Sequence, residues 1–396
     1  MISERAKRVK PSPTLQMDAK AKEMKAQGID VLSFSVGEPD FDTPEHIKEA
    51  AIRAMREGKT KYTPVGGIPE LKEAIIAKLK RDNGLDYKPE EIIVSCGAKH
   101  SLYNIAQAIL SPGDEVIIPS PYWVSYPAQV LLNDGEPIIV ETTEDEGFVL
   151  NPEALKEKIT PKTKAIMLNY PSNPTGLTYS EEALKRIAEI ALEHNLYIIS
   201  DEIYEKLLYD GLKHISIASL SEEVKQKTLL VNGLSKAYSM TGWRIGYTAG
   251  PQDVIKAMTK IQSQSTSNPT SIAQWAAVEA LNGPQEFLDE MVREFDQRRK
   301  ILVDGLNKLE GISCRMPTGA FYAFPNVKGV LGKRAGDLEI TDSSTLALYL
   351  LEQAKVAAVP GSAFGAEGYI RISYATSREN ITEGLNRIGE ALARLS

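Results

Sequence analysis

The strongest constraint on the fold is a series of short apolar segments between residues 92 and 249, separated from one another by amphipathic stretches. The segments are Ile92–Val94, Val116–Ile118, Pro137–Val140, Ala165–Leu168, Tyr197–Ile199, Leu229–Val231 and Arg244–Ala249. Apolar strands that alternate with helices predict a mainly parallel sheet covered on both faces. In such sheets ligands bind at the carboxyl ends of the strands. The sequence therefore predicts an α/β fold with a functional site at those strand ends.

The segments before and after this series predict the remaining elements. We expect a charged arm over residues 1 to about 30, in which Pro11 to Thr14 is extended or turning, because proline disfavours helix in the residue before it. The other predicted elements are a strand at Val31–Ser35, a helix with Thr43 as its N-cap running to about Glu57, a helix from Pro69 to about Asp82, a long helix with Phe287 to Leu306 on one apolar face, a strand at Tyr369–Tyr374 and a terminal helix from about Ser377.

These elements predict two domains. We expect an N-terminal arm at residues 1–13, a large domain at residues 46–300 with a mainly parallel seven-stranded sheet between helices, and a smaller α/β domain made from residues 14–45 and 301–396. The sequence holds no internal repeat and no low-complexity linker.

The composition excludes several classes of protein. The 396 residues include 46 Lys and Arg against 53 Asp and Glu, a net charge of −7, which argues against a nucleic-acid binder that works through a basic surface. No stretch approaches the roughly 18 apolar residues of a membrane helix, and no signal peptide is predicted. Cys96 and Cys314 are too few and too far apart for a disulfide framework or a Cys-x-x-Cys site. We therefore expect no metal and a cytoplasmic location.

The stretch Gly233–Gly246 follows the predicted strand Leu229–Val231. Within it, Lys236 and Arg244 flank a loop of small residues. Arginine presents a fixed fork for phosphate, whereas a desolvated lysine can act as a neutral amine nucleophile. A ligand with an anionic end and an electrophilic centre suits this pair, and pyridoxal phosphate is such a ligand. The alternative is a surface turn with two solvated charges, since lysine is rarely buried.

The turn Gly97-Ala98-Lys99 directly follows the first strand of the series and opens a predicted helix. The backbone N–H groups and the positive end of the helix dipole can hold a phosphate there. An ordinary strand-to-helix turn is the alternative.

Asp201 and Tyr204 follow the strand Tyr197–Ile199. A carboxylate at this place can keep a pyridine nitrogen protonated, and the tyrosine can hydrogen-bond a phenolic oxygen of the same ring. The alternatives are a helix N-cap for Asp201 and a packing role for Tyr204.

Asn173, Trp123 and Arg371 complete the candidate residues. Asn173 can donate to the same ring oxygen or belong to a Pro-flanked turn. Trp123 can stack on a flat cofactor or pack in the core. The guanidinium group of Arg371 can bind a carboxylate through two parallel hydrogen bonds, or it can be solvated on an edge strand.

Together these motifs span about residues 10 to 375 and resemble the class I aminotransferases, the aspartate aminotransferase family of pyridoxal-phosphate enzymes of fold type I. The similarity is greatest to the bacterial branch that uses aspartate and sometimes prephenate. The resemblance implies Lys236 as the residue that condenses with the cofactor aldehyde, Asp201 at the pyridine nitrogen, Tyr204 and Asn173 at the ring oxygen, Trp123 stacked on the ring, and Gly97, Ala98, Lys99, Ser235 and Arg244 at the phosphate, with Tyr62 reaching in from the second subunit of a homodimer.

The resemblance also implies the substrate contacts. Arg371, Asn173 and the backbone of Gly37 would bind the α-carboxylate of the substrate. Lys99 and Thr14 would bind the distal carboxylate of a dicarboxylic substrate. One position departs from the family pattern, because Gly233 stands where many relatives have a serine that contacts the phosphate.

The implied function is transamination between L-aspartate and 2-oxoglutarate with ping-pong kinetics, extended in some members to arogenate or prephenate. Lys236 would serve as base and acid. The alternatives are an aminotransferase of broader specificity for alanine, aromatic or kynurenine-type substrates, and a pyridoxal-phosphate-dependent lyase. A transcriptional regulator of this type needs a DNA-binding domain for which the N-terminal arm is too short, and a nicotinamide dehydrogenase needs a Gly-x-Gly-x-x-Gly motif that does not follow the first strand.

Overall fold

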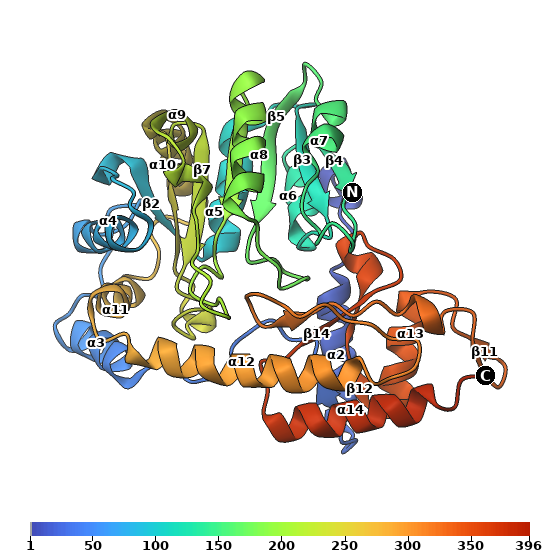
Figure 1. Ribbon diagram of the computed structural model, residues 1–396. Coiled ribbons are helices and arrows are strands. Elements are labelled where there is room, and N and C mark those ends of the chain that lie inside the picture. Colours follow the sequence, from blue (N-terminus) through green and yellow to red (C-terminus); the bar gives the residue numbers. More distant parts are fainter. Residues whose placement is uncertain (1) are drawn as a thin grey trace.

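The computed structural model describes residues 2–396. Figure 1 shows an upper α/β part and a lower part that contains the end of the chain, with the long helix α12 (Glu286–Leu306) running beneath the upper part and above α14 (Arg378–Leu392).

A seven-stranded sheet forms the centre of the upper part. Its strand order is β2-β8-β7-β6-β5-β3-β4, and the pairs are parallel except where β8 meets β2 and β7. The prediction of a mainly parallel seven-stranded sheet is therefore confirmed. The strands are β2 (Ile92–Ser95), β3 (Glu115–Ser120), β4 (Glu136–Glu141), β5 (Thr163–Asn169), β6 (Tyr197–Asp201), β7 (Thr228–Gly233) and β8 (Gly246–Ala249).

Helices cover both faces of this sheet because its strands are apolar on both sides. Along β5, Ala165 and Met167 pack in one core cluster with residues of α5 and α10, whereas Ile166 and Leu168 pack in another with residues of α7 and α8. Successive side chains of a strand point to opposite faces, so a fully apolar strand requires two covering layers.

Helix boundaries in the upper part follow local signals. Ser180 caps α8 by accepting a hydrogen bond from the Ala183 N–H, and α4 begins at Pro69 and ends before Gly84 in the left-handed conformation. The helices of this part are α3 (Glu45–Arg56), α4 (Pro69–Asn83), α5 (Ala98–Ile109), α6 (Ser125–Leu132), α7 (Pro152–Lys158), α8 (Glu181–Glu193), α9 (Glu222–Lys225), α10 (Gln252–Ser265) and α11 (Ser271–Asn282).

Segments from both ends of the chain form the lower part (Figure 1). Ala21 of α2 packs with Leu351 and Ala357 from the C-terminal segment, and β1 pairs with β12. A second α/β unit built from both termini was predicted, and the residue boundaries of the two domains stay a prediction. The elements are α2 (Pro13–Ala26), β1 (Leu32–Ser33), β9 (Tyr322–Ala323), β10 (Arg334–Ala335), β11 (Leu338–Glu339), α13 (Ser343–Tyr349), β12 (Val356–Ala357), β13 (Val359–Pro360), β14 (Ile370–Ser373) and α14 (Arg378–Leu392).

The N-terminal arm differs from its prediction. Helix α2 starts at Pro13, so Thr14 is helical rather than extended, because proline fits the first turn of a helix, where its missing N–H is not needed. A short helix α1 (Glu4–Arg8) precedes it, and Arg5 pairs with Asp134 of the upper part at 2.6 Å.

Several predicted boundaries shift by one or two residues. Pro44 rather than Thr43 is the N-cap of α3, β14 is shorter than the predicted strand at each end, and β8 begins at Gly246 rather than Arg244. The last shift arises because Arg244 has a positive φ of 58° and ends a turn of 3-10 helix.

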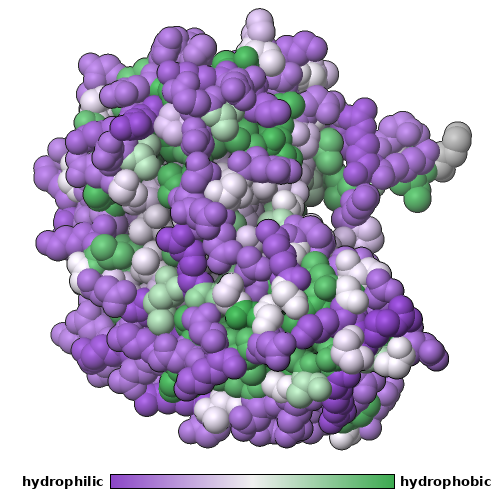
Figure 2. Space-filling model, turned by 45° about the vertical axis from the view of Figure 1, so that its right-hand side comes forward, coloured by the Kyte–Doolittle hydropathy of each residue, from purple (hydrophilic) through white to green (hydrophobic). Residues whose placement is uncertain are grey.

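Hydrophilic residues cover most of the face in Figure 2, and apolar residues gather in groups near its middle. No helix within residues 2–396 combines the length and the apolarity that crossing a bilayer requires. Cys96 and Cys314 are both free thiols.

Candidate active site

One cleft of about 500 Å³ is lined by residues of the upper and the lower part. Of the predicted site residues, all but Gly97 and Tyr62 line it. They are Thr14, Gly37, Ala98, Lys99, Trp123, Asn173, Asp201, Tyr204, Ser235, Lys236, Arg244 and Arg371.

The sheet brings most of these residues to one edge. Asp201 is the last residue of β6, and Lys236 follows β7 by three residues. Strand β2 is antiparallel to β8, and β8 is antiparallel to β7, so β2 runs in the same direction as β7 and delivers Gly97 to the same edge. The cleft therefore lies where open α/β sheets bind ligands.

The Lys236 side chain enters the cleft half-buried, and its Nζ donates a hydrogen bond to the Gly37 carbonyl oxygen. Burial lowers the pKa of Lys236 to about 8, and the Arg371 charge acts in the same direction. A large fraction of this amine is neutral near pH 8, which is the state in which lysine is a nucleophile or a base. The alternative of a solvated surface turn is therefore wrong for Lys236.

Asp201 ends β6 with 4% of its surface exposed. Its Oδ2 accepts a hydrogen bond from Tyr126 Oη at 2.7 Å, and its Oδ1 accepts one from the Ile203 N–H at 3.3 Å. Burial raises the pKa of this carboxyl to about 6, although the hydrogen bond from Tyr126 opposes the rise. Asp201 belongs to a strand and a turn follows it, so the helix N-cap alternative is wrong.

Tyr204 and Asn173 approach the cleft from two different loops. The Tyr204 hydroxyl shares a hydrogen bond of 2.8 Å with the Tyr322 hydroxyl, and burial raises the pKa of Tyr204 well above its ordinary value. Tyr204 is therefore protonated and can donate near neutral pH. The Asn173 N–H donates to Asn169 Oδ1 at 2.8 Å, which fixes the loop after β5.

Arg371 lies on β14, the middle strand of the three-stranded sheet β13-β14-β9, and is 2% exposed. Its Nη1 donates to Asn173 Oδ1 at 2.9 Å and its Nη2 to the Ser35 carbonyl oxygen at 2.6 Å, while its buried Nε has no hydrogen-bond partner. Within residues 2–396 no carboxylate lies within ion-pair distance of it. The solvated edge-strand alternative is wrong, and the guanidinium is a buried cation that lacks an anion.

The turn that opens α5 contains unpaired backbone donors, and Arg244 approaches it from the loop before β8. The N–H groups of Ala98 and Lys99 have no acceptor in the described chain. Gly97 has φ +90°, and a Cβ there would lie 2.4 Å from Arg244 Nη2, so only glycine lets the guanidinium approach. The Arg244 guanidinium bonds to two carbonyl oxygens, those of Thr241 at 2.7 Å and Cys96 at 3.3 Å.

Gly233 is closely packed against the strand that leaves this loop. A Cβ at Gly233 would lie 2.9 Å from the Ile245 carbonyl oxygen and 3.0 Å from Gly246 Cα. The departure from the family pattern therefore coincides with a backbone contact that leaves little space for a serine side chain.

Trp123, Lys99 and Thr14 also line the cleft. Lys99 Nζ lies 4.8 Å from the centroid of the Trp123 ring, and partial burial lowers the pKa of Lys99. The Thr14 hydroxyl is buried and has no hydrogen-bond partner. Thr14 of α2 and Lys99 of α5 therefore belong to the lining of the same cleft.

Tyr62 is not part of the cleft formed by this chain, and 92% of its surface is exposed. An exposed tyrosine in an ordered turn is consistent with the predicted contact to a second subunit, which stays a prediction.

Several residues of the cleft were not predicted from the sequence. Tyr126, which bonds to Asp201, stands three residues after Trp123, and this helical spacing was the available signal. Tyr322 contacts Tyr204 from the lower part and had no signal in the sequence. The outer face of α2 adds Asp18 and Lys22 at helical spacing from Thr14.

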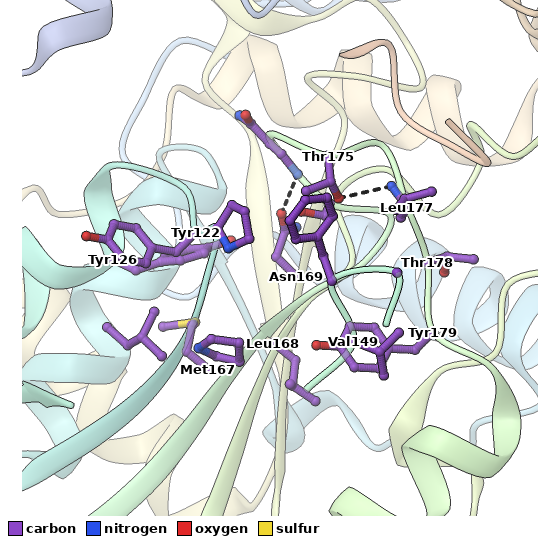
Figure 3. Close-up of a pocket in the computed structure, with 17 residues that line it drawn as sticks. Tyr122, Tyr126, Val149, Met167, Leu168, Asn169, Thr175, Leu177, Thr178 and Tyr179 are labelled. Atoms are coloured by element: carbon purple, nitrogen blue, oxygen red, sulfur yellow. Dashed lines mark hydrogen bonds between the residues drawn. The ribbon is translucent and has the colours of Figure 1, made fainter. Parts of the chain in front are cut away.

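A smaller enclosed cavity lies beside the cleft between the ends of β3 and β5 and the loop after β5 (Figure 3). Figure 3 shows Tyr122, Tyr126 and Tyr179 around it, and Tyr126, Asn169 and Asn173 line both this cavity and the cleft. Its volume of about 30 Å³ is close to that of one water molecule, so it is too small for a cofactor.

Comparison with known proteins decides the family. The family model described as aminotransferase class I and II matches residues 29–388. The chain belongs to this family. It is 54% identical to the aspartate aminotransferase of Geobacillus stearothermophilus over 98% of each chain, and 52% identical to a probable aspartate/prephenate aminotransferase of Aquifex aeolicus over 100% of this chain and 99% of that one.

Solved structures of the family agree with the fold. The aspartate aminotransferase from Rhizobium meliloti superposes with a TM-score of 0.97 at 48% identity over all of both chains. The Thermus thermophilus aspartate aminotransferase with maleate superposes with a TM-score of 0.93 at 48% identity over 99% of each chain. The expected fold type and aminotransferase family are therefore confirmed.

The cofactor of this family is pyridoxal phosphate, and the donors and acceptors of the cleft fit it. The free N–H groups of Ala98 and Lys99 and the guanidinium of Arg244 suit a phosphate dianion. At the opposite end, the buried Asp201 carboxylate suits a protonated ring nitrogen, and Lys236 Nζ lies in the same cleft.

Proposed function

We propose that this aminotransferase transfers the amino group of L-aspartate to 2-oxoglutarate with ping-pong kinetics. The observation that carries the proposal is the convergence, in one cleft, of a lysine with a lowered pKa, a buried carboxylate and a buried arginine without an anion. These three groups are what an amino acid needs in order to be bound by its α-carboxylate and deprotonated at Cα.

We propose the following roles around the cofactor. Lys236 holds it covalently, Asp201 faces its ring nitrogen, Tyr204 and Asn173 face its ring oxygen, and Trp123 stacks on the ring. The turn Gly97-Ala98-Lys99, Ser235 and Arg244 hold its phosphate. The support is their position around one cleft and the unpaired donors described above.

The same cleft explains how the amino acid is held and deprotonated. Arg371 binds the α-carboxylate with its fork, together with Asn173 and the backbone N–H of Gly37, whose carbonyl oxygen is engaged by Lys236. Bound pyridoxal phosphate supplies an aldehyde for the amino group and a ring that withdraws electrons from Cα. Lys236 Nζ, when neutral, can accept the proton from Cα. The resulting ammonium group can then donate the proton to the cofactor carbon that is bonded to the transferred nitrogen.

Lys99 and Thr14 favour a substrate with a second carboxylate. Lys99 and Thr14 both line the cleft, and the Thr14 hydroxyl has no hydrogen-bond partner. Relatives at about half identity over the whole chain are named aspartate aminotransferase or aspartate/prephenate aminotransferase, and the Thermus thermophilus structure contains maleate, a dicarboxylate. We therefore propose a dicarboxylic amino donor and test prephenate as a further acceptor.

Half-reaction spectroscopy tests the substrate proposal. Each amino acid is added without an oxo acid, and the loss of the cofactor's aldehyde-state absorbance is followed. Aspartate and glutamate should discharge this absorbance, and 2-oxoglutarate, oxaloacetate or prephenate should restore it. If alanine or phenylalanine discharges it while aspartate and glutamate do not, the proposed substrate class is wrong.

We further propose a cytoplasmic homodimer whose active sites are shared through Tyr62. The two free cysteines support the location, and the exposed Tyr62 ring supports the shared site. Mixing Tyr62→Ala subunits with Lys236→Ala subunits tests the sharing, because a hybrid dimer concentrates both defects in one site and leaves the other intact. Recovery of activity in the mixture is expected, and a mixture that stays as inactive as its parents contradicts a shared site.

A further inference from the structure

A buried hydrogen-bond cluster lies on the far side of β6 from the cleft, directly behind Asp201. Its centre is Glu202, the residue after Asp201, whose surface is fully buried. Glu202 directly follows β6, and its side chain bonds to Ser200, which points to the face opposite Asp201. Glu202 therefore faces away from the cleft that Asp201 lines.

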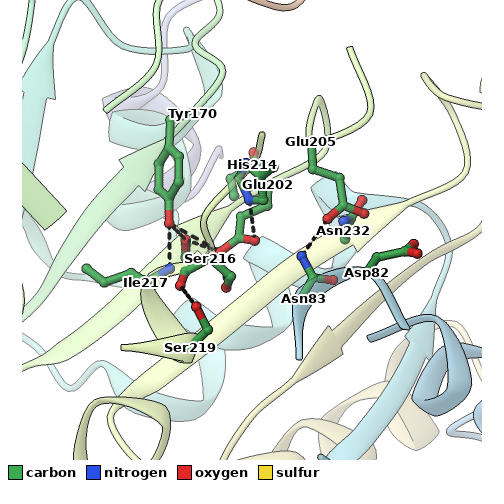
Figure 4. Close-up of polar contacts among 12 residues, drawn as sticks. Asp82, Asn83, Tyr170, Glu202, Glu205, His214, Ser216, Ile217, Ser219 and Asn232 are labelled. Carbon is green, nitrogen blue, oxygen red and sulfur yellow. Dashed lines mark hydrogen bonds and ion pairs between the residues drawn. The ribbon is translucent and has the colours of Figure 1, made fainter. Parts of the chain in front are cut away.

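The Glu202 carboxylate accepts hydrogen bonds from four side chains (Figure 4). Oε1 accepts from the Ser200 and Ser216 hydroxyls, both at 2.8 Å, and from Tyr170 Oη at 3.3 Å. Oε2 lies 2.7 Å from His214 Nε2. His214 Nδ1 is buried without a partner, so we assign the ring proton to Nε2, which donates to Glu202.

This cluster holds together three segments that carry proposed cofactor contacts. Tyr170 begins the loop that leads to Asn173, and its backbone N–H donates to the Asp201 carbonyl oxygen at 3.3 Å. The Tyr170 and His214 rings are stacked with centroids 5.3 Å apart. The Glu202 N–H continues the sheet by donating to the Val231 carbonyl oxygen at 2.9 Å, on the strand that precedes Lys236.

The neighbouring charged pair is organised differently. Glu205 pairs with Lys78 of α4 and accepts from Asn83 Nδ2 at 3.0 Å, away from the loop that carries Asn173. Glu202, Glu205 and His214 offer atoms within 4.8 Å of one another, but Lys78 already neutralises Glu205 and four donors already satisfy Glu202. These three side chains are therefore hydrogen-bonding groups rather than an open metal site.

We propose that Glu202 and His214 are positioning residues for the cofactor. Hydrogen-bonded to each other, they hold the Asp201 strand end and the Asn173 loop against the ring, and the Glu202 charge acts on the ring through Asp201. The inference rests on the proposed placement of Asp201 at the ring nitrogen. Glu202 and His214 touch neither cofactor nor substrate.

The test compares Glu202→Gln with the matched control Glu205→Gln in the holoenzyme. The readouts are the cofactor dissociation constant by equilibrium dialysis, the pH at which the bound cofactor changes its visible absorbance, and Tm. We expect Glu202→Gln to weaken cofactor binding about tenfold and to lower the absorbance pKa by about half a unit or more, because a negative charge near a cationic ring is removed. Glu205→Gln should lower Tm and leave both cofactor readouts unchanged.

A second pair of variants separates the hydrogen bond from the packing. His214→Gln keeps a donor toward Glu202 and should keep wild-type cofactor affinity, whereas His214→Phe keeps only the stacking on Tyr170 and should weaken the affinity about tenfold. This pair decides the question if Glu202→Gln does not fold.

Two results would overturn the inference. The first is a Glu202→Gln enzyme that loses stability like Glu205→Gln but keeps the wild-type cofactor affinity and absorbance pKa. The second is equal affinity in His214→Gln and His214→Phe. Asp201→Asn is measured alongside and separates the proposed place of Asp201 from the proposed role of Glu202 and His214. Unchanged absorbance in that variant contradicts the proposed place of Asp201 itself.

Discussion

Replacing Arg371 by methionine should separate substrate binding from folding. Arg371 is 2% exposed and bonds to two neutral acceptors, and no carboxylate neutralises it. Hydrogen bonds to charged groups contribute about 1.5–3 kcal/mol each, so a bidentate α-carboxylate contact is worth about 3–6 kcal/mol. Methionine should therefore lower kcat/KM by roughly 100-fold to more than 10,000-fold.

The stability of the same variant should change little. Asn173 Oδ1 and the Ser35 carbonyl oxygen lose their donor, which costs about 1–3 kcal/mol each. Removing an uncompensated buried cation returns several kcal/mol, because burying an ion carries a penalty of that size. The two effects oppose each other, and the free energy of unfolding should stay within about 2 kcal/mol of wild type.

Steady-state kinetics with aspartate and urea unfolding of the apoenzyme measure the two quantities separately. Arg371→Lys is the control, since it keeps the charge and loses the fork, and its kcat/KM should fall between those of wild type and Arg371→Met. The reasoning is refuted if Arg371→Met loses more than about 4 kcal/mol of stability, the size seen when a partnered buried charge is broken, or if it retains wild-type kcat/KM.

Three other substitutions have defined outcomes. Lys236→Ala should bind the cofactor and leave it nearly inert. In the apoenzyme, the stability of wild type relative to this variant should increase between about pH 8 and pH 10.5. The reason is that folded Lys236, with a pKa of about 8, binds fewer protons in this range than Lys236 in the unfolded chain does. The apoenzyme of Asp201→Asn should become more stable relative to wild type as the pH rises from 3.8 to about 6 and should keep that gain above pH 6. The reason is that the raised pKa of Asp201 makes its ionisation costly in the folded state. Urea unfolding at several pH values measures the pH dependence of both variants. Tyr126→Phe should raise the pKa of Asp201 further and weaken cofactor binding several-fold by equilibrium dialysis, because it removes the hydrogen bond that favours the carboxylate.

The sheet was predictable from the sequence because its strands are locally marked. Each predicted strand is a short, mainly apolar run, and all seven overlap the observed strand to within two residues at each end. The prediction Arg244–Ala249 began two residues too early because Arg244 has a left-handed backbone at the end of a 3-10 turn, which the hydrophobic pattern does not mark.

Residues that face the cleft from the lower part were harder to predict. Arg371 was ambiguous because a charged residue between two isoleucines suits an edge strand as well as a buried site, and only its pairing between β13 and β9 removes the solvent. Tyr322 bonds to Tyr204 across 118 residues of sequence, a distance at which periodicity carries no information. The roles of the predicted site residues stay predictions.

The division of the cleft between the two parts of the chain has a mechanical consequence. Lys236 and Asp201 belong to the sheet, whereas Arg371, Gly37 and Thr14 belong to segments that pack around the lower part. An amino acid bound by its carboxylate to Arg371 and deprotonated by Lys236 must therefore touch both parts at once. Because Arg371 is buried without an anion, we expect the α-carboxylate to supply the charge that the guanidinium lacks.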